Sequence, residues 1–318
     1  MLPAVHAMGR KAMLICDEYL TPTSLAEAFE AMQRSRGKFR IIAGATDILP
    51  WARAGRAGDV EIPVLIDVSR VPDLHDARVG KRRVRLGAAT PIQRFLDNPE
   101  FARALPSMPR CAVWFADEQI RAQATVGGNI VNASPAADVT PALIAYDAEV
   151  ELANYSGGKV QRRRMRLDQF VTGPNRTALE EGELLIAIEC DALPGYGGSF
   201  EKVGQRRSLV ISVACLATLV KLDEAGRRFE DVRLAIGGIG PVPQRLAEVE
   251  AFLRGGPLSP ARLQEAADMP VSLVASRTRQ AYRRDVVHGF VLRGLINAAR
   301  RAGADPDAIG AELETAYG

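Results

Sequence analysis

The chain reads Ile41-Ile42-Ala43-Gly44-Ala45-Thr46-Asp47-Ile48-Leu49 where a short apolar strand runs into a glycine, and this junction decides the fold. A second glycine-bearing segment reads Thr125-Val126-Gly127-Gly128-Asn129. We call them the first bend and the second bend. Glycine turns let backbone N–H groups converge on a pyrophosphate, and Thr, Asp and Asn side chains can hydrogen-bond phosphate or sugar hydroxyls. The bends therefore predict a dinucleotide site, with two ordinary turns as the alternative.

Neither bend matches GxGxxG or GxxxxGKS/T, so neither a Rossmann domain nor a P-loop is indicated. The 318 residues are 47% hydrophobic and 25% charged, which is ordinary globular composition. A formal charge of +3 supplies no field that would hold nucleic acid or a membrane surface. The longest apolar run, residues 209–220, is shorter than the ~20 residues of a bilayer span and predicts buried structure.

The first thirteen residues lack an apolar segment and a small-residue cleavage pattern, so we expect no secretory signal and a cytoplasmic protein. The four cysteines have no CxxC spacing, which is typical of unpaired thiols in a reducing compartment. The histidines are equally dispersed. Metal sites need clustered ligands, so we expect no metal on this polypeptide. The dispersed residues are Cys16, Cys111, Cys190, Cys215, His6, His75 and His288.

Strands and helices alternate along the first half of the chain. A capping-box spacing at Ser24 predicts a helix, and Thr90-Pro91-Ile92-Gln93 predicts another with proline at its first position. Residues 121–138 are rich in small residues and predict a loop, followed by a short helix around Leu143. Apolar runs predict strands at 39–43, 63–68, 83–88, 149–152 and 185–188.

A turn-rich segment at 193–198 predicts a domain boundary. After it, strands come first and helices last, which favours a smaller α+β unit. The strands are expected near Phe200, Val213 and Leu234, and the helices around Leu246, Leu263 and Val286.

Several motifs occur in a fixed order between about Tyr19 and Ala299. They are Ala43-Gly44-Ala45-Thr46-Asp47, then Arg121-Ala122-Gln123-Ala124-Thr125-Val126-Gly127-Gly128-Asn129-Ile130, Ala133-Ser134-Pro135-Ala136-Ala137-Asp138, Phe200-Glu201-Lys202-Val203-Gly204 and Tyr282-Arg283-Arg284. In content and order the chain resembles the FAD-binding subunit of the xanthine dehydrogenase family, also known from the medium subunit of carbon monoxide dehydrogenase.

The resemblance implies an α+β fold in which FAD lies between two domains. An FAD-binding domain of the vanillyl-alcohol-oxidase type, made of two subdomains (1–69 and 70–193), would precede a smaller C-terminal α+β domain like that of the CO dehydrogenase flavoprotein (194–318). Many relatives have a second glycine where this chain has Ala45. If that position needs a positive φ, alanine would strain the loop by roughly 1 kcal/mol or more.

The resemblance also implies roles for individual residues. Residues 41–49 would wrap the pyrophosphate with backbone amides, and residues 125–129 would form its second support. Ser134 belongs to the same site, Asp138 would take a ribityl or adenosine hydroxyl, and Lys202 would stabilise negative charge on the reduced ring. Weaker expectations are Phe115 as an aromatic contact and Leu185 and Ile186 on a strand against the cofactor, since all three could be plain core residues. Lys202 could equally point into solvent.

Arginine clusters at Arg206-Arg207, Arg162-Arg163-Arg164 and Tyr282-Arg283-Arg284 have no assigned role. They could contact NAD or a partner subunit, pack within the chain, or form a solvated face.

The implied activity is electron transfer. A molybdopterin-binding large subunit would hydroxylate the substrate, and a small subunit with two [2Fe–2S] clusters would pass electrons to the FAD of this chain, which would deliver them to NAD⁺ or another acceptor. We expect no catalytic acid–base pair here, because the flavin supplies the chemistry. The alternatives are a self-sufficient FAD-dependent oxidase of the same fold class and a non-catalytic assembly scaffold.

Overall fold

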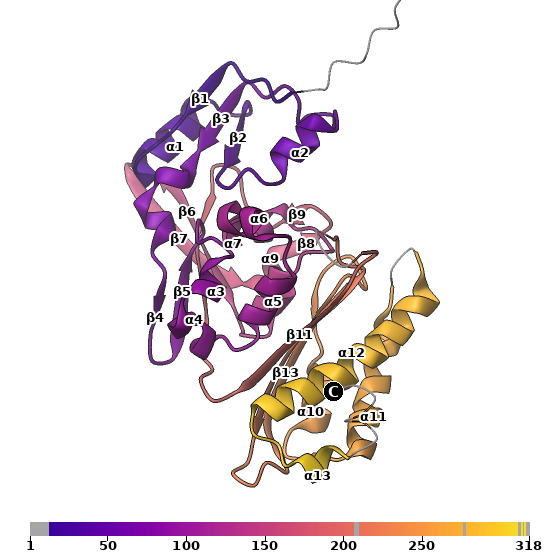
Figure 1. Cartoon of the computed structure of the whole chain (residues 1–318). Helices are drawn as coiled ribbons and strands as arrows, with labels where there is room; N and C mark the ends of the chain where they lie inside the picture. The colour runs from indigo at the N-terminus through magenta and orange to yellow at the C-terminus, as the bar shows by residue number, and fades with distance from the viewer. Residues whose placement is uncertain (1–12, 207–209, 276–277, 311–312, 314, 316–318) are drawn as a thin grey trace, which may run out of the picture.

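The computed structural model describes residues 13–206, 210–275, 278–310, 313 and 315, and these fold around three main β-sheets (Figure 1). The sheets follow one another along the chain and in space. The N-terminal sheet lies at one end of the molecule, and the C-terminal helices lie at the other.

The first sheet has three parallel strands in the order β1-β3-β2: β1 Glu18–Leu20, β2 Phe39–Ile42 and β3 Val64–Asp67. Helix α1 (Leu25–Arg34) covers it, and the predicted start is confirmed because Ser24 Oγ accepts from the Glu27 amide at 3.2 Å. The carboxylate of Glu27 reaches back to the Thr23 amide at 2.7 Å. Helix α2 (Ile48–Arg53) begins within the last two residues of the first bend, and the one-turn helices η1 (Val68–Arg70) and η2 (Pro72–His75) follow β3.

The second sheet has five antiparallel strands in the order β4-β5-β10-β6-β7. Their bounds are β4 Arg78–Val79, β5 Arg83–Gly87, β6 Glu149–Ser156, β7 Lys159–Arg166 and β10 Leu184–Asp191. Strands β8 (Val171–Gly173) and β9 (Arg176–Thr177) form a separate pair. The helices of this region are α3 Arg94–Asp97, α4 Pro99–Ala104, α5 Met108–Trp114, α6 Glu118–Gln123, α7 Val126–Asn132, α8 Val139–Ile144 and α9 Leu167–Phe170.

Two local expectations in this region are wrong. The helix predicted to open at Thr90-Pro91 begins only at Arg94, because Pro91 forms a β-bridge with Thr125 instead. The small-residue stretch 121–138 is not a continuous loop, since α7 runs through it. Its sequence has poor helix formers, so contacts to the neighbouring strand end must supply the stability that propensity does not.

The third sheet is antiparallel, in the order β11-β12-β13-β14, and is buried on both faces. Along β12, Cys215, Ala217 and Leu219 join the core of the flanking five-stranded sheet, while the intervening residues pack on the C-terminal helices. This burial accounts for the part of the apolar run from Val213 onward. The expectation of buried structure is wrong for Ile211, which lies before β12 and is 80% exposed. The strands are β11 Gly197–Val203, β12 Ala214–Leu222, β13 Phe229–Gly237 and β14 Gln244–Arg245; the helices are α10 Ala247–Leu253, α11 Pro260–Asp268, η3 Met269–Leu273, α12 Gln280–Arg301 and α13 Pro306–Ile309.

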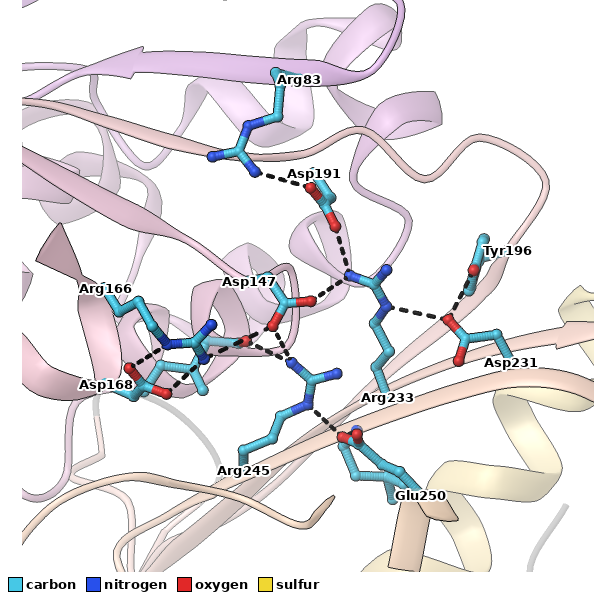
Figure 2. Close-up of polar contacts among 12 residues, drawn as sticks. Arg83, Asp147, Arg166, Asp168, Asp191, Tyr196, Asp231, Arg233, Arg245 and Glu250 are labelled. Carbon is cyan, nitrogen blue, oxygen red and sulfur yellow. Dashed lines mark hydrogen bonds and ion pairs between the residues drawn. The ribbon is translucent and has the colours of Figure 1, made fainter. Parts of the chain in front are cut away.

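An ionic network joins the second and third sheets (Figure 2). Arg233 on β13 donates to Asp147 at 2.9 Å and to Asp191 at 2.8 Å. Arg245 on β14 donates to Asp147 at 2.6 Å, and Arg83 on β5 approaches Asp191 at 2.8 Å. Asp147 and Asp191 each accept from an arginine of the third sheet, so the network connects the two sheets by charge-assisted hydrogen bonds.

The arginine clusters on β7 and α12 have intramolecular partners. Arg163 pairs with the buried Glu183 at 2.6 Å, and Arg164 pairs with Glu189 at 2.8 Å. Arg283 donates to the carbonyls of Val213 and Gly238, which ties the start of α12 to the third sheet. Packing therefore accounts for Arg283; Arg207 lies outside the described residues.

All four cysteines are free, and three of them are buried. None of the helices in the described ranges has both the length and the apolar character needed to cross a bilayer. In the same ranges no three His, Cys, Asp or Glu side chains gather as a metal site would require.

Candidate functional site

The two bends lie against each other, although they are about eighty residues apart in sequence. A Cβ added to Gly44 would lie only 2.0 Å from the carbonyl oxygen of Gln123, two residues before the second bend. Asn132, at the end of α7, donates to the carboxylate of Asp47 at 3.0 Å. The expected juxtaposition of the two bends is thus present, and Gly44 is required for it.

The first bend presents free backbone donors. Between the end of β2 and the first turn of α2, the amide N–H groups of residues 44–48 donate no hydrogen bond to any other described residue. Successive amides without internal partners form an anion-binding concavity, and the helix that follows adds a partial positive charge. The first bend therefore has the donors that a pyrophosphate needs.

The second bend uses its amides internally. Val126 donates to the carbonyl of Thr90 at 3.0 Å and Gly127 to that of Ala88 at 2.8 Å. Gly128 donates to Thr125 Oγ1 at 3.0 Å, which is an N-cap of α7. What remains for a ligand is the side chain of Asn129, whose buried Oδ1 has no hydrogen-bond partner in the described part of the chain.

The glycines of the second bend have different surroundings. A Cβ on Gly127 would meet Ala88 at 2.7 Å, so this glycine allows α7 to pack on the end of β5. A Cβ on Gly128 would meet only the Thr125 hydroxyl, at 2.9 Å, and the residue is exposed. Gly128 alone leaves room for a ligand on the open side.

Asp138 and Lys202 form a buried ion pair between the second and third sheets. The Lys202 ammonium donates to Asp138 Oδ2 at 2.5 Å and to the Trp114 carbonyl at 3.1 Å. Ser212 donates to Asp138 Oδ1 at 2.5 Å. The Lys202 side chain is only 2% exposed, so the alternative of a solvent-facing lysine is wrong. Burial raises the pKa of Asp138 above its ordinary value, and the neighbouring Lys202 acts in the opposite direction.

The remaining expected residues lie in different settings. Leu185 and Ile186 are fully packed in the core, on the irregular part of β10 where its register with β6 shifts. Phe115 follows the last residue of α5 and is half-buried, and its carbonyl accepts from Arg121 at 3.1 Å. Ser134 accepts from the Ala136 amide at 3.3 Å in the turn that leads to Asp138.

Three alanines around these residues have left-handed backbone conformations. Ala45 in the first bend has φ 54°, Ala116 beside Phe115 has φ 43°, and Ala133 at the end of α7 has φ 47°. Each such residue costs of order 1–2 kcal/mol, and such strain clusters at ligand sites because the surrounding structure enforces it. The positive φ that would strain alanine at position 45 is therefore present.

A separate open hollow of about 430 Å³ lies beside the residues that follow β5. Its lining includes Thr90, Arg94 and Ala122, and none of the expected cofactor residues. We place the site at the bends rather than in this hollow, because the bends combine five free amides with the unpartnered buried Asn129 oxygen among the described residues.

Fold and site together define a dinucleotide-binding α+β protein with a C-terminal domain packed against the binding region. Residues 13–190 match the family model described as the FAD binding domain in molybdopterin dehydrogenase, and residues 199–298 match the CO dehydrogenase flavoprotein C-terminal domain. The chain therefore belongs to the FAD-binding subunit family of the molybdopterin dehydrogenases. The predicted family and fold class are confirmed.

Individual relatives agree with this assignment. The chain is 29% identical to the glyceraldehyde dehydrogenase medium chain of Sulfolobus acidocaldarius, over 88% of this chain and 98% of that one. It is also 29% identical to a putative xanthine dehydrogenase FAD-binding subunit of Escherichia coli, over 82% and 87%. A carbon monoxide dehydrogenase structure from Hydrogenophaga pseudoflava superposes with a TM-score of 0.82 at 26% identity, covering 91% of this chain and 99% of that chain.

The residues present fit FAD. Free amides at 44–48 suit the charge of a pyrophosphate, and the orphaned Asn129 oxygen needs a donor such as a sugar hydroxyl. Sequence reasoning missed three groups that complete the region: Ser212, the Trp114 carbonyl and Asn132. Only Asn132 had a sequence signal, because it stands between two of the quoted motifs.

Proposed function

We propose that this FAD-binding subunit is the electron relay of a molybdenum hydroxylase. It takes electrons from a [2Fe–2S] partner subunit and passes them to NAD⁺ or another acceptor, while a molybdopterin-binding large subunit oxidises the substrate. The free amides of the first bend, held against the second bend in a chain of this family, are the observation that carries the proposal. The cytoplasm is the compartment we expect for it.

The bound flavin would supply the two-electron chemistry, exchanging a hydride at its N5 atom. The chain binds and orients the cofactor. The first bend donates N–H groups to the pyrophosphate, and the Asn129 side chain and Gly128 face the same ligand from the second bend. The buried ammonium of Lys202 places a positive charge where the C-terminal domain meets the FAD-binding region, which favours the negative charge that reduction adds.

The test uses the purified chain reconstituted with FAD. We expect it to oxidise NADH with an artificial two-electron acceptor and to leave a purine or another N-heterocycle unchanged, because substrate oxidation requires the molybdopterin subunit. The matched control is the same chain stripped of FAD, which should be inactive in both assays.

Two outcomes would contradict the proposal in different ways. Reduction of the flavin by a heterocycle without any partner would identify a self-sufficient oxidase. Folded protein that stays colourless after incubation with excess FAD would identify an assembly scaffold.

A further inference from the structure

Asp138 is the first residue before α8, yet its carboxylate makes no cap hydrogen bond to that helix. An aspartate at this position normally accepts from the second or third amide of the helix, which stabilises the helix by about 1 kcal/mol. Here both carboxylate oxygens are engaged by side chains of the C-terminal domain, Oδ1 by Ser212 and Oδ2 by Lys202. The Asp138 carboxylate therefore does not cap α8 and instead binds two side chains of the C-terminal domain.

The geometry leaves one donor of Lys202 available. An ammonium has three N–H donors, and the contacts of Lys202 within the described ranges are two, Asp138 and the Trp114 carbonyl. A buried donor without a partner is costly, so the third N–H calls for an acceptor. Its direction depends on where Asp138 holds the ammonium.

Ser212 fixes that direction. The Ser212 residue is only 5% exposed, and the 2.5 Å hydrogen bond from its hydroxyl to Oδ1 opposes rotation of the carboxylate. Without it, Asp138 can turn towards the uncapped amides of α8 or present both oxygens to Lys202, and either change reorients the ammonium. We propose that Ser212 is a positioning residue of the FAD site, acting through Asp138 to aim Lys202 at the flavin. This inference rests on the proposed function.

The experiment measures the dissociation constant of FAD on the apo form of the full chain, by titration of flavin fluorescence. We expect Ser212→Ala to weaken FAD binding about tenfold, the size of one hydrogen bond to a charged group. Ser212→Thr, which retains the hydroxyl, should restore most of the affinity. Ser212→Cys, nearly isosteric with a weak donor, should fall between them and replaces the alanine variant if that variant does not fold.

A double-variant cycle separates positioning from a merely structural role. In an Asp138→Ala background, Ser212→Ala should change FAD affinity less than twofold, because the side chain through which Ser212 acts is gone. A tenfold loss in both backgrounds, or wild-type affinity in Ser212→Ala, would overturn the proposal.

The matched control is Thr218→Val on the neighbouring β12, which removes a buried hydroxyl that has no partner among the described residues and should leave the affinity unchanged. If the proposed function itself is wrong, the wild-type protein will bind no FAD, and this result is distinct from any effect of the Ser212 variants.

Discussion

The first and second bends have similar composition but use their backbones in opposite ways. In the first bend, five successive amides have no acceptor within the described residues. In the second bend, the amides of residues 126–129 are all engaged, with Ala88, Thr90 and Thr125 as acceptors. One bend therefore has the donors for a ligand, and the other is a rigid support against which the first is positioned.

The glycines of the two bends also have different roles. Gly44 and Gly127 allow backbone segments to touch, the first against Gln123 and the second against Ala88. Gly128 alone borders open space. A glycine in a nucleotide-binding motif can thus serve packing rather than ligand approach, and the two roles predict different results on substitution.

The largest effect is expected for Gly44→Ala, which tests whether the bends must touch. The new Cβ would meet backbone atoms of Gln123 that cannot move aside, so the first bend must separate from the second. We expect the free energy of unfolding to fall by about 3 kcal/mol and FAD to be lost. Denaturant titration and flavin absorbance after gel filtration would measure the two effects.

The control for Gly44→Ala is Gly289→Ala. Gly289 lies inside α12, where a Cβ meets no heavy atom within 4 Å, so helix propensity should raise stability by about 0.5–1 kcal/mol. Full flavin content in Gly44→Ala would show that contact between the bends is dispensable.

Substitutions of the two glycines of the second bend should distinguish the glycine that packs against β5 from the glycine that borders the cofactor. Gly127→Ala forces a contact with Ala88 and should cost about 2 kcal/mol of stability, while folded molecules still bind FAD. Gly128→Val should cost about 1 kcal/mol, through the disturbed Thr125 cap, yet abolish FAD retention because a branched side chain enters the space of the pyrophosphate. Yellow protein from Gly128→Val would contradict the assignment of this face to the cofactor.

Thr125 in the second bend and Thr46 in the first should also differ in whether they affect stability or FAD binding, with smaller effects than the glycines. Thr125→Ala removes the cap of α7 and should lower stability by about 1 kcal/mol. The hydroxyl of Thr46 has no hydrogen-bond partner in the described ranges, so Thr46→Ala should leave stability within about 0.5 kcal/mol. It should instead weaken FAD binding about fivefold, as the loss of one neutral hydrogen bond would. Equal stability losses in the two variants would mean that the first bend is also a structural support.

Apolar periodicity is a local signal, and it predicted the apolar strands and the C-terminal helices. It gave no signal for β7, whose sequence is rich in arginine. The sequence missed α7, since Val-Gly-Gly-Asn is unfavourable for a helix and the segment is held by the Thr125 cap and by contacts to the end of β5. It placed Asp138 and Lys202 in the site but not against each other. Their contact spans 64 residues and the contact to Ser212 spans 74, and no spacing rule encodes such pairings.

The smallest effect is expected for Ala45→Gly, which asks whether strain in the first bend serves binding. At φ 54° alanine is strained by roughly 1–2 kcal/mol, and glycine removes this strain but adds about 0.5–1 kcal/mol of unfolded-state entropy. The net gain in stability should be about 0.5–1 kcal/mol. If the strain only reflects the enforced shape of the bend, FAD affinity should stay unchanged. If alanine holds the free amides in their binding geometry, affinity should fall as stability rises, and the first bend would then differ from the second in rigidity as well as in its donors.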